Sequence, residues 1–199
     1  MRRVGRKVLH RGRWLVLEDL AYRGRDGRVF HWEAVCRRRT RTVVVVAARL
    51  VPSNRIVLIR QFRPVVDGWV IGLPAGIVDH GTPRQTALRE LREETGYRGR
   101  FRSMSPAMLS NPALLTDRVH LVQVDVDERA TANRAPRQAL EPSEEIEVFA
   151  MPPAHVRSFL LRRARLGDHI SSGPWYLFAG AGVRRGEEAR SQVRCPRTA

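Results

Sequence analysis

Cysteine and long apolar runs are scarce in this 199-residue chain. The two cysteines, Cys36 and Cys195, fall in an expected strand and in the C-terminal tail, which argues against a disulfide framework. The six histidines are scattered, and no cluster has the spacing of a zinc site. No apolar run approaches the ~18 residues of a membrane span, and no signal-peptide-like segment follows the basic residues 1–7. We therefore expect a cytoplasmic protein.

Lysine is also nearly absent, although basic residues outnumber acidic ones by 36 to 20 and give a net charge of +16. Such a charge is typical of nucleic-acid-binding proteins. The arginines are spread over the whole chain, however, and Lys7 is the only lysine, which indicates a compositional bias. A positive field also suits a small phosphate-rich substrate, so we expect neither a nucleic acid nor a membrane as partner.

The apolar pattern predicts strands separated by one central helix, with further helices near the C-terminus. Strands are expected at residues 14–22, 29–35, 42–51, 56–62, 101–104, 119–126 and 146–151, and helices at 83–95, 153–165 and around 175–178. This order predicts an α/β protein, an α/β/α sandwich with a mixed sheet. We divide it into an N-terminal hairpin extension (1–40), a main domain (41–183) and a disordered tail (184–199).

The most informative stretch is G-T-P-R-Q-T-A-L-R-E-L-R-E-E-T-G-Y at residues 81–97. Thr82 with Gln85 three residues later forms a capping-box pattern, and Pro83 suits the first helical turn. Gly96 suits the other end, where a left-handed residue often stops a helix.

Three glutamates of this helix, Glu90, Glu93 and Glu94, share one face. Like charges at this spacing each cost about 0.2–0.5 kcal/mol, which a bound cation would relieve. Several carboxylates on one face are the oxygen ligands that Mg²⁺ prefers, especially when a substrate phosphate completes the coordination. Arg89, four residues before Glu93, can hold that carboxylate in place. A solvated acidic helix face is the alternative interpretation.

The run R-E-L-R-E-E-T-G-Y from Arg89, with L-P-A-G-I-V-D upstream at 73–79, resembles the Nudix box of the Nudix hydrolases. This resemblance independently implies the α/β/α fold. One glutamate of the box is missing: Gly81 stands where it belongs, and Gly76 is one residue too close to be the first box glycine. The metal-binding half is intact, so the departure concerns rate and loop geometry more than metal binding.

The resemblance implies a metal site and a general base. Its metal ligands would be Glu90, Glu94 and the carbonyl of Ala75, with Glu93 acting directly or through water, and Mg²⁺ (or Mn²⁺) as the ion. The base would be Glu144 or its neighbour, residue 145, just before the strand at 146–151. A solvated loop is the other interpretation of that pair.

The flanking residues resemble the ADP-ribose and ADP-sugar pyrophosphatase branch, through Q-F-R-P at 61–64, the turn at 68–69 and Pro112. The resemblance implies a homodimer in which Trp14 and Trp32, one from each subunit, stack on adenine. The remaining implied substrate contacts are Arg37 and Arg63 to the phosphates, Glu33 to the base and Asn111 to the terminal ribose.

The expected reaction is hydrolysis of ADP-ribose to AMP and ribose 5-phosphate. Two alternatives stay open. One is a Nudix hydrolase of another diphosphate, such as a GDP-sugar or a dinucleotide. The other is a catalytically weak module that binds ADP-ribose as a sensor, which the missing box glutamate motivates.

Overall fold

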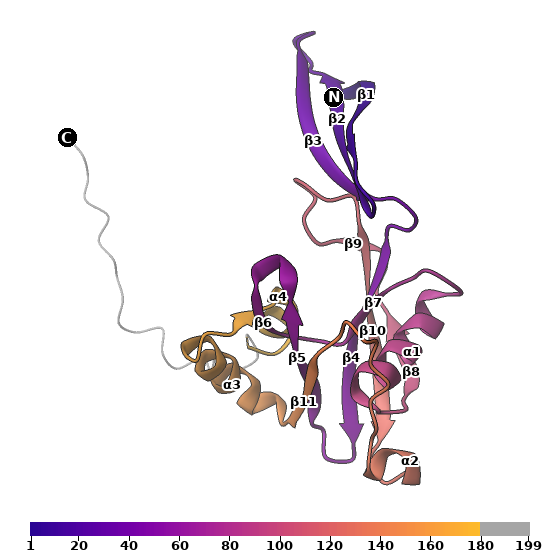
Figure 1. Cartoon of the computed structure of the whole chain (residues 1–199), viewed down its shortest axis with the longest axis vertical. Helices are drawn as coiled ribbons and strands as arrows, with labels where there is room; N and C mark the ends of the chain where they lie inside the picture. Colours follow the sequence, from indigo (N-terminus) through magenta and orange to yellow (C-terminus); the bar gives the residue numbers. More distant parts are fainter. Residues whose placement is uncertain (180–199) are drawn as a thin grey trace, which may run out of the picture.

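A computed structural model describes residues 1–179 (Figure 1). The expected tail at 184–199 and Cys195 lie outside these residues. Cys36, by contrast, is buried in its strand and has a free thiol.

The first 37 residues form a separate antiparallel sheet of three strands. Its strands are β1 (Arg2–Arg11), β2 (Leu15–Arg23) and β3 (Val29–Arg37). The β2–β3 hairpin was predicted, but β1 was not. Most β1 side chains are basic and exposed, so the strand shows no apolar alternation and depends on pairing with β2. Figure 1 shows this sheet projecting from one end of the body.

The body is built on a mixed nine-stranded sheet. Its strands are β4 (Thr42–Val51), β5 (Ile56–Arg63), β6 (Gly68–Gly72), β7 (Ala75–Ile77), β8 (Arg100–Met104), β9 (Met108–Leu109), β10 (Arg118–Asp127), β11 (Ile146–Met151) and β12 (His169–Ile170). β10 runs parallel to β4, and β12 parallel to β6, whereas the other pairs are antiparallel. All the predicted strands are present, which confirms the mixed sheet.

Two long helices cover the sheet from opposite sides, α1 (Pro83–Thr95) and α3 (Pro153–Arg165) (Figure 1). Shorter helical segments are η1 (Pro64–Val66), α2 (Thr131–Arg134), α4 (Ser172–Pro174) and η2 (Trp175–Ala179). Alternate β4 residues, including Val44 and Val46, pack with Leu91 of α1, while Val45 faces the core that α3 closes. The α/β/α sandwich is therefore confirmed. Within residues 1–179 no helix has the length and apolar character needed to cross a bilayer.

Candidate active site

Both ends of α1 are fixed by the residues that the sequence indicates. The Thr82 hydroxyl accepts a hydrogen bond from the Gln85 backbone N–H, and the Gln85 side chain accepts one from the Thr82 N–H at 2.9 Å. Gly96 ends the helix at φ 76°, and its N–H donates to the carbonyl of Arg92 at 2.8 Å. A helix closed at both ends holds its side chains in a fixed orientation.

Burial of one face of α1 turns its acidic face toward β7. Ala87 and Leu91 are fully buried against β4 and β10. Glu94 is only 2% exposed, and its Oε2 accepts a hydrogen bond from the Ala75 N–H at 3.0 Å. The last turn of the helix is thereby joined to the strand that precedes it in the chain.

Gly76 lets the second carboxylate lie against the same strand. A Cβ at this position would lie 2.1 Å from the Glu90 Cδ, far inside van der Waals contact. The absence of a side chain is therefore what allows Glu90 to pack on the β7 backbone. The glycine serves close approach rather than an unusual φ.

The two packed carboxylates have strongly raised pKa values. Burial raises the pKa of Glu94 to about 8, against the opposing effect of the Ala75 hydrogen bond. Burial also raises the pKa of Glu90 to about 7, with further contributions from Glu93 and Glu144. Desolvation and mutual repulsion both disfavour the charged forms. A divalent cation bound between the two carboxyl groups would instead favour their charged forms.

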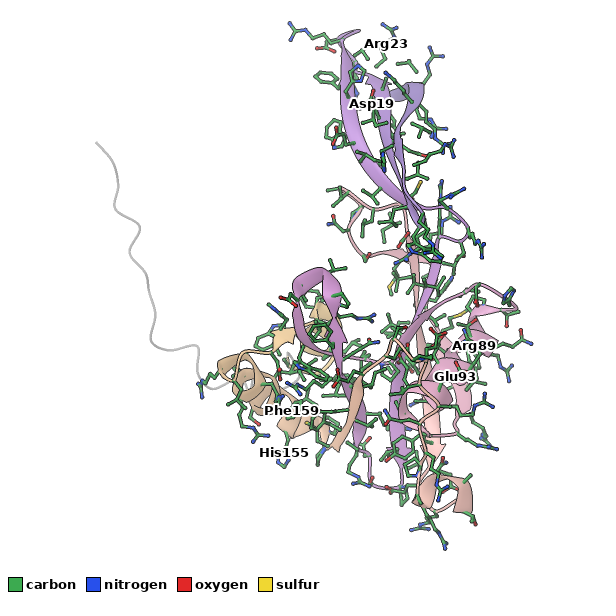
Figure 2. The ribbon with its side chains drawn as sticks, viewed as in Figure 1. Asp19, Arg23, Arg89, Glu93, His155 and Phe159 are labelled. Atoms are coloured by element: carbon green, nitrogen blue, oxygen red, sulfur yellow. The ribbon has the colours of Figure 1, made fainter. Side chains whose placement is uncertain are left out.

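Arg89 organises the remaining acidic groups of the helix (Figure 2). Its guanidinium lies 2.7 Å from Glu90 and 2.7 Å from Glu93, and 3.6 Å from Asp79. Glu93 is therefore turned toward Arg89. Asp79 lies in the loop between β7 and α1, where the box glutamate is missing. Its carboxylate faces Arg89 from this loop.

The donor set fits a hard divalent ion. Within residues 1–179, no three acidic, histidine or cysteine side chains meet as a complete metal site. The buried carboxylate of Glu94, the partly buried carboxylate of Glu90 and the adjoining backbone at Ala75 instead form a partial set of oxygen donors. Mg²⁺ is typically held by one or two carboxylates, with waters and substrate phosphates as its other ligands.

Glu144 lies close enough to this pair for its charge to raise the pKa of both carboxylates. Its Oε2 accepts a hydrogen bond from the Glu141 N–H at 3.0 Å. Glu145 is exposed, and its carbonyl accepts a hydrogen bond from Phe62. Of the two candidates for a general base, the structure brings Glu144 toward the site.

Gln138 fastens this loop to α1, and sequence reasoning missed it. Its Nε2 donates to the carbonyl of Glu94 at 2.6 Å and to that of Ile146 at 3.1 Å. The Ala139 N–H donates to the carbonyl of Glu93 at 2.9 Å. The bonds to Glu93 and Glu94 satisfy carbonyls in the last turn of α1. No sequence pattern indicates such a contact, because it joins residues more than 40 positions apart.

The arginines expected at the phosphates have different surroundings. Arg63 is close enough for its charge to lower the pKa of Glu94. Arg37 is ion-paired with Asp117, which is 8% exposed, at 2.8 Å. Asn111 lies in the exposed loop after β9, where its carbonyl accepts two backbone hydrogen bonds. Of Arg63, Arg37 and Asn111, Arg63 is the residue whose charge lowers the pKa of a carboxyl in the pair, that of Glu94.

The two tryptophans lie on the N-terminal sheet and are exposed, Trp14 by 64% and Trp32 by 53%. The Trp14 carbonyl accepts from the Arg38 N–H, and Trp32 pairs with Leu20, so they are separated by six residues along β3. At about 3.3 Å per residue this is roughly 20 Å. Two indoles of one chain therefore cannot sandwich one ring. Glu33, the expected base contact, lies on the same strand opposite Asp19.

A cavity of about 570 Å³ opens beside Ala75 and Arg63. Its floor is the sheet face formed by β4, β5, β6 and β10, and residues 171–177 and the β9 loop form its other walls. Neither tryptophan lines it.

The NUDIX domain profile matches residues 39–176, which is more than half of the chain. The chain belongs to the Nudix family. It is 34% identical over 149 residues to an ADP-ribose pyrophosphatase of Saccharomyces cerevisiae, covering 70% of this chain and 64% of that protein. It therefore spans less than two thirds of the yeast enzyme.

Two further relatives are covered more fully. A mouse ADP-sugar pyrophosphatase is 31% identical over 155 residues, with 73% of this chain and 71% of that protein covered. A GDP-mannose pyrophosphatase of Cronobacter sakazakii is 32% identical over 148 residues, with 70% of this chain and 75% of that protein covered. The crystal structure of an ADP compounds hydrolase superposes on this chain with a TM-score of 0.62 at 18% sequence identity. The match covers 81% of this chain and 84% of that structure, and it supports the fold alone.

Proposed function

We propose that this Nudix protein hydrolyses the pyrophosphate bond of ADP-ribose or related ADP-sugars, with Mg²⁺, to AMP and a sugar phosphate. The observation that carries this proposal is the pair of carboxylates against β7, buried Glu94 and partly buried Glu90, with Arg63 nearby. Relatives that act on ADP-ribose and ADP-sugars support the substrate class.

Glu90, Glu94 and the carbonyl of Ala75 would hold the metal, and Glu93 would contribute through water. The metal, when bound, neutralises the pyrophosphate and lowers the pKa of a ligated water. The chain supplies the rest. Arg63 places a positive charge beside the phosphates, and a guanidinium suits two phosphate oxygens at once.

Glu144 would accept the proton of the attacking water. Its position before β11 brings it toward the carboxylate pair, and the Gln138 hydrogen bonds hold that segment to α1. Because Arg89 already engages Glu93 and Glu90, these groups are oriented before the substrate arrives.

Adenine would stack between Trp14 of one subunit and Trp32 of its partner in a homodimer. Each stacked face contributes roughly 1–3 kcal/mol. Large apolar side chains are exposed on the N-terminal sheet, which a partner subunit would cover. They are Val4, Leu9, Trp14, Leu15, Val29, Phe30 and Trp32. Arg37, Glu33 and Asn111 remain the proposed contacts to phosphate, base and terminal ribose.

The second candidate is hydrolysis of a GDP-sugar, which the similarity to bacterial GDP-mannose pyrophosphatases favours. Purified protein incubated with ADP-ribose, ADP-glucose and GDP-mannose, with and without Mg²⁺, separates the candidates once products are identified. AMP from ADP-ribose only with Mg²⁺ is the expected result. Preferred cleavage of GDP-mannose would support the second candidate. Tight binding of ADP-ribose without turnover, unchanged in Glu94→Gln, would indicate a sensor.

A further inference from the structure

A further pocket, of about 490 Å³, lies where the N-terminal sheet joins the body. Its walls come from the starts of β4 and β10 and from the loop between β9 and β10. The lining residues are Arg41, Thr42, Leu109, Pro112, Leu115, Thr116 and Arg118. Leu109 is the one residue that also borders the 570 Å³ cavity. No residue placed in the proposed diphosphate site lines this pocket.

The pocket and the 570 Å³ cavity lie on opposite faces of the main sheet. Thr42 pairs with Arg118 across β4 and β10, and the register continues regularly from this pair. Because side chains alternate between the two faces of a sheet, Thr42 and Arg118 share the face of Val44, which α1 covers. Val45 and Val119 face the other way and line the cavity. A ligand in the pocket would therefore not occupy the cavity.

The two arginines of the pocket are adjacent and have no acidic partner. The Arg118 N–H donates to the Arg41 carbonyl at 2.6 Å, so their backbones are in contact. Neither guanidinium forms an ion pair within residues 1–179. The buried carboxylates near this joint are already engaged, Asp117 by Arg37 at 2.8 Å and Glu18 by an arginine of β1. Two like charges this close repel each other, so an anion between them would be attracted to both.

The side chain of Thr116 adds an unused hydrogen-bond donor to the pocket wall. Its hydroxyl is the one buried polar side-chain group in the described part of the chain that has no hydrogen-bond partner. A buried hydroxyl without a partner is unfavourable, and a ligand oxygen that accepts from it removes that cost. The Thr116 N–H donates to the Val35 carbonyl at 3.2 Å, which holds the residue against β3. The pocket therefore combines two guanidiniums and a hydroxyl, all of them donors.

We propose that this pocket binds the oxyanion of inorganic phosphate or of a phosphate monoester. Arg41 and Arg118 supply guanidiniums, whose parallel N–H groups match phosphate oxygens, and Thr116 donates its hydroxyl. The volume lies within the range of small-molecule pockets. The bound anion would connect the start of β4 with the loop that is bridged to β3 at Val35, and so tie the N-terminal sheet to the body. The proposal goes beyond the proposed hydrolysis and uses none of its residues.

The test titrates inorganic phosphate into the metal-free protein at constant ionic strength, by isothermal titration calorimetry. Arg118→Ala and Arg41→Ala each remove one guanidinium, and Thr116→Val removes the hydroxyl at nearly constant volume. Arg102→Ala is the matched control, because Arg102 is an exposed arginine of β8 outside the pocket. We expect saturable binding to the wild type and to the control. Binding should weaken by about tenfold or more in either pocket-arginine variant and by about threefold or more in Thr116→Val.

Arg63→Ala distinguishes the pocket from the diphosphate site, and it should bind phosphate as tightly as the wild type does. Binding that is lost in Arg63→Ala but kept in Arg118→Ala and Arg41→Ala would place the anion beside the acidic helix and overturn the proposal. The absence of saturable binding to the wild type would overturn it as well. Because none of these measurements needs catalysis, a failure of the proposed hydrolysis does not affect them.

Circular dichroism verifies that each variant folds. If an arginine variant does not fold, amide NMR shifts of the wild type during the same titration decide the question. Saturating shifts at Thr116 and Arg118 would support the proposal, and shifts confined to other regions would refute it. A repeat with ribose 5-phosphate identifies the source of the anion, since tighter binding than that of inorganic phosphate indicates a monoester, and equal or weaker binding indicates inorganic phosphate.

Discussion

The acidic site at α1 and the N-terminal sheet differ in whether their functional side chains have partners within one chain. Around α1 and β7, Glu94 and the packed glycine Gly76 have their partners in the same chain. On the N-terminal sheet, by contrast, Trp14 and Trp32 are exposed and roughly 20 Å apart. The proposed chemistry can therefore be assigned to one subunit, whereas the proposed stacking of the base would need a second. Changes in the two parts should therefore have different kinetic signatures.

The largest effect is expected from Glu94→Gln. Loss of a buried charged ligand should lower kcat by at least about 10³-fold, because electrostatic stabilisation is often the largest single contribution to catalysis. The metal-free variant should be at least as stable as the wild type, since a buried carboxylate that resists ionisation is removed. Steady-state kinetics and thermal unfolding measure both. Asp26→Asn at the tip of the N-terminal sheet is the control, and equal losses in both variants would contradict the assignment.

Gly76→Ala should come next. Its Cβ would meet Glu90 at 2.1 Å, so the carboxylate or β7 must move. We expect a loss of about 10²-fold in kcat/KM and about 1–3 kcal/mol in unfolding free energy, typical of overpacking. Gly12→Ala, whose Cβ would lie 3.4 Å from the Leu15 carbonyl, is the matched control. Full activity in Gly76→Ala would show that the close approach is dispensable.

Trp32→Ala and Trp14→Ala should act on binding. Each should raise KM for ADP-ribose about 10- to 100-fold with little change in kcat, in line with roughly 1–3 kcal/mol per stacked face. Mixing the two variants should restore part of the activity, because a heterodimer regains one site with both indoles. Kinetics of the mixture measure this. No recovery from an exchanging dimer would refute the shared site.

The smallest expected effect is the pH dependence of stability. The carboxyl of Glu94 has a folded pKa of about 8 against a usual 4.5, so between these values the folded state keeps a proton that the unfolded state releases. Stability of the metal-free protein should therefore fall as pH rises through this window. Even if Glu94 changed the free energy of unfolding by only about 1 kcal/mol, which is less than a pKa change of one unit contributes, Tm would fall by roughly 2–4 °C. Thermal melts at pH 5.5 and 8 with EDTA measure the drop, which should become smaller in Glu94→Gln, where Glu90 is left as a carboxyl with a raised pKa. Mg²⁺ should raise Tm more at pH 8.

Patterns between residues close in sequence predicted most of the fold, but they predicted the candidate active site only in part. The caps at Thr82 and Gly96 and the helix at 153–165 follow from residues adjacent in sequence. β1 was missed because its stability comes from pairing rather than from its own pattern. Gln138 and the 570 Å³ cavity depend on contacts between distant residues, which periodicity does not encode.

The claim at the centre of this interpretation is that Glu90 and Glu94 bind a divalent cation beneath the diphosphate. A crystal structure with Mn²⁺ and a non-hydrolysable ADP-ribose analogue tests it most directly, because anomalous scattering locates the ion. We predict an ion bound by both carboxylates and the Ala75 carbonyl, in contact with the analogue's phosphates. An ion bound elsewhere, with Glu94 still accepting only the Ala75 N–H, would contradict the claim.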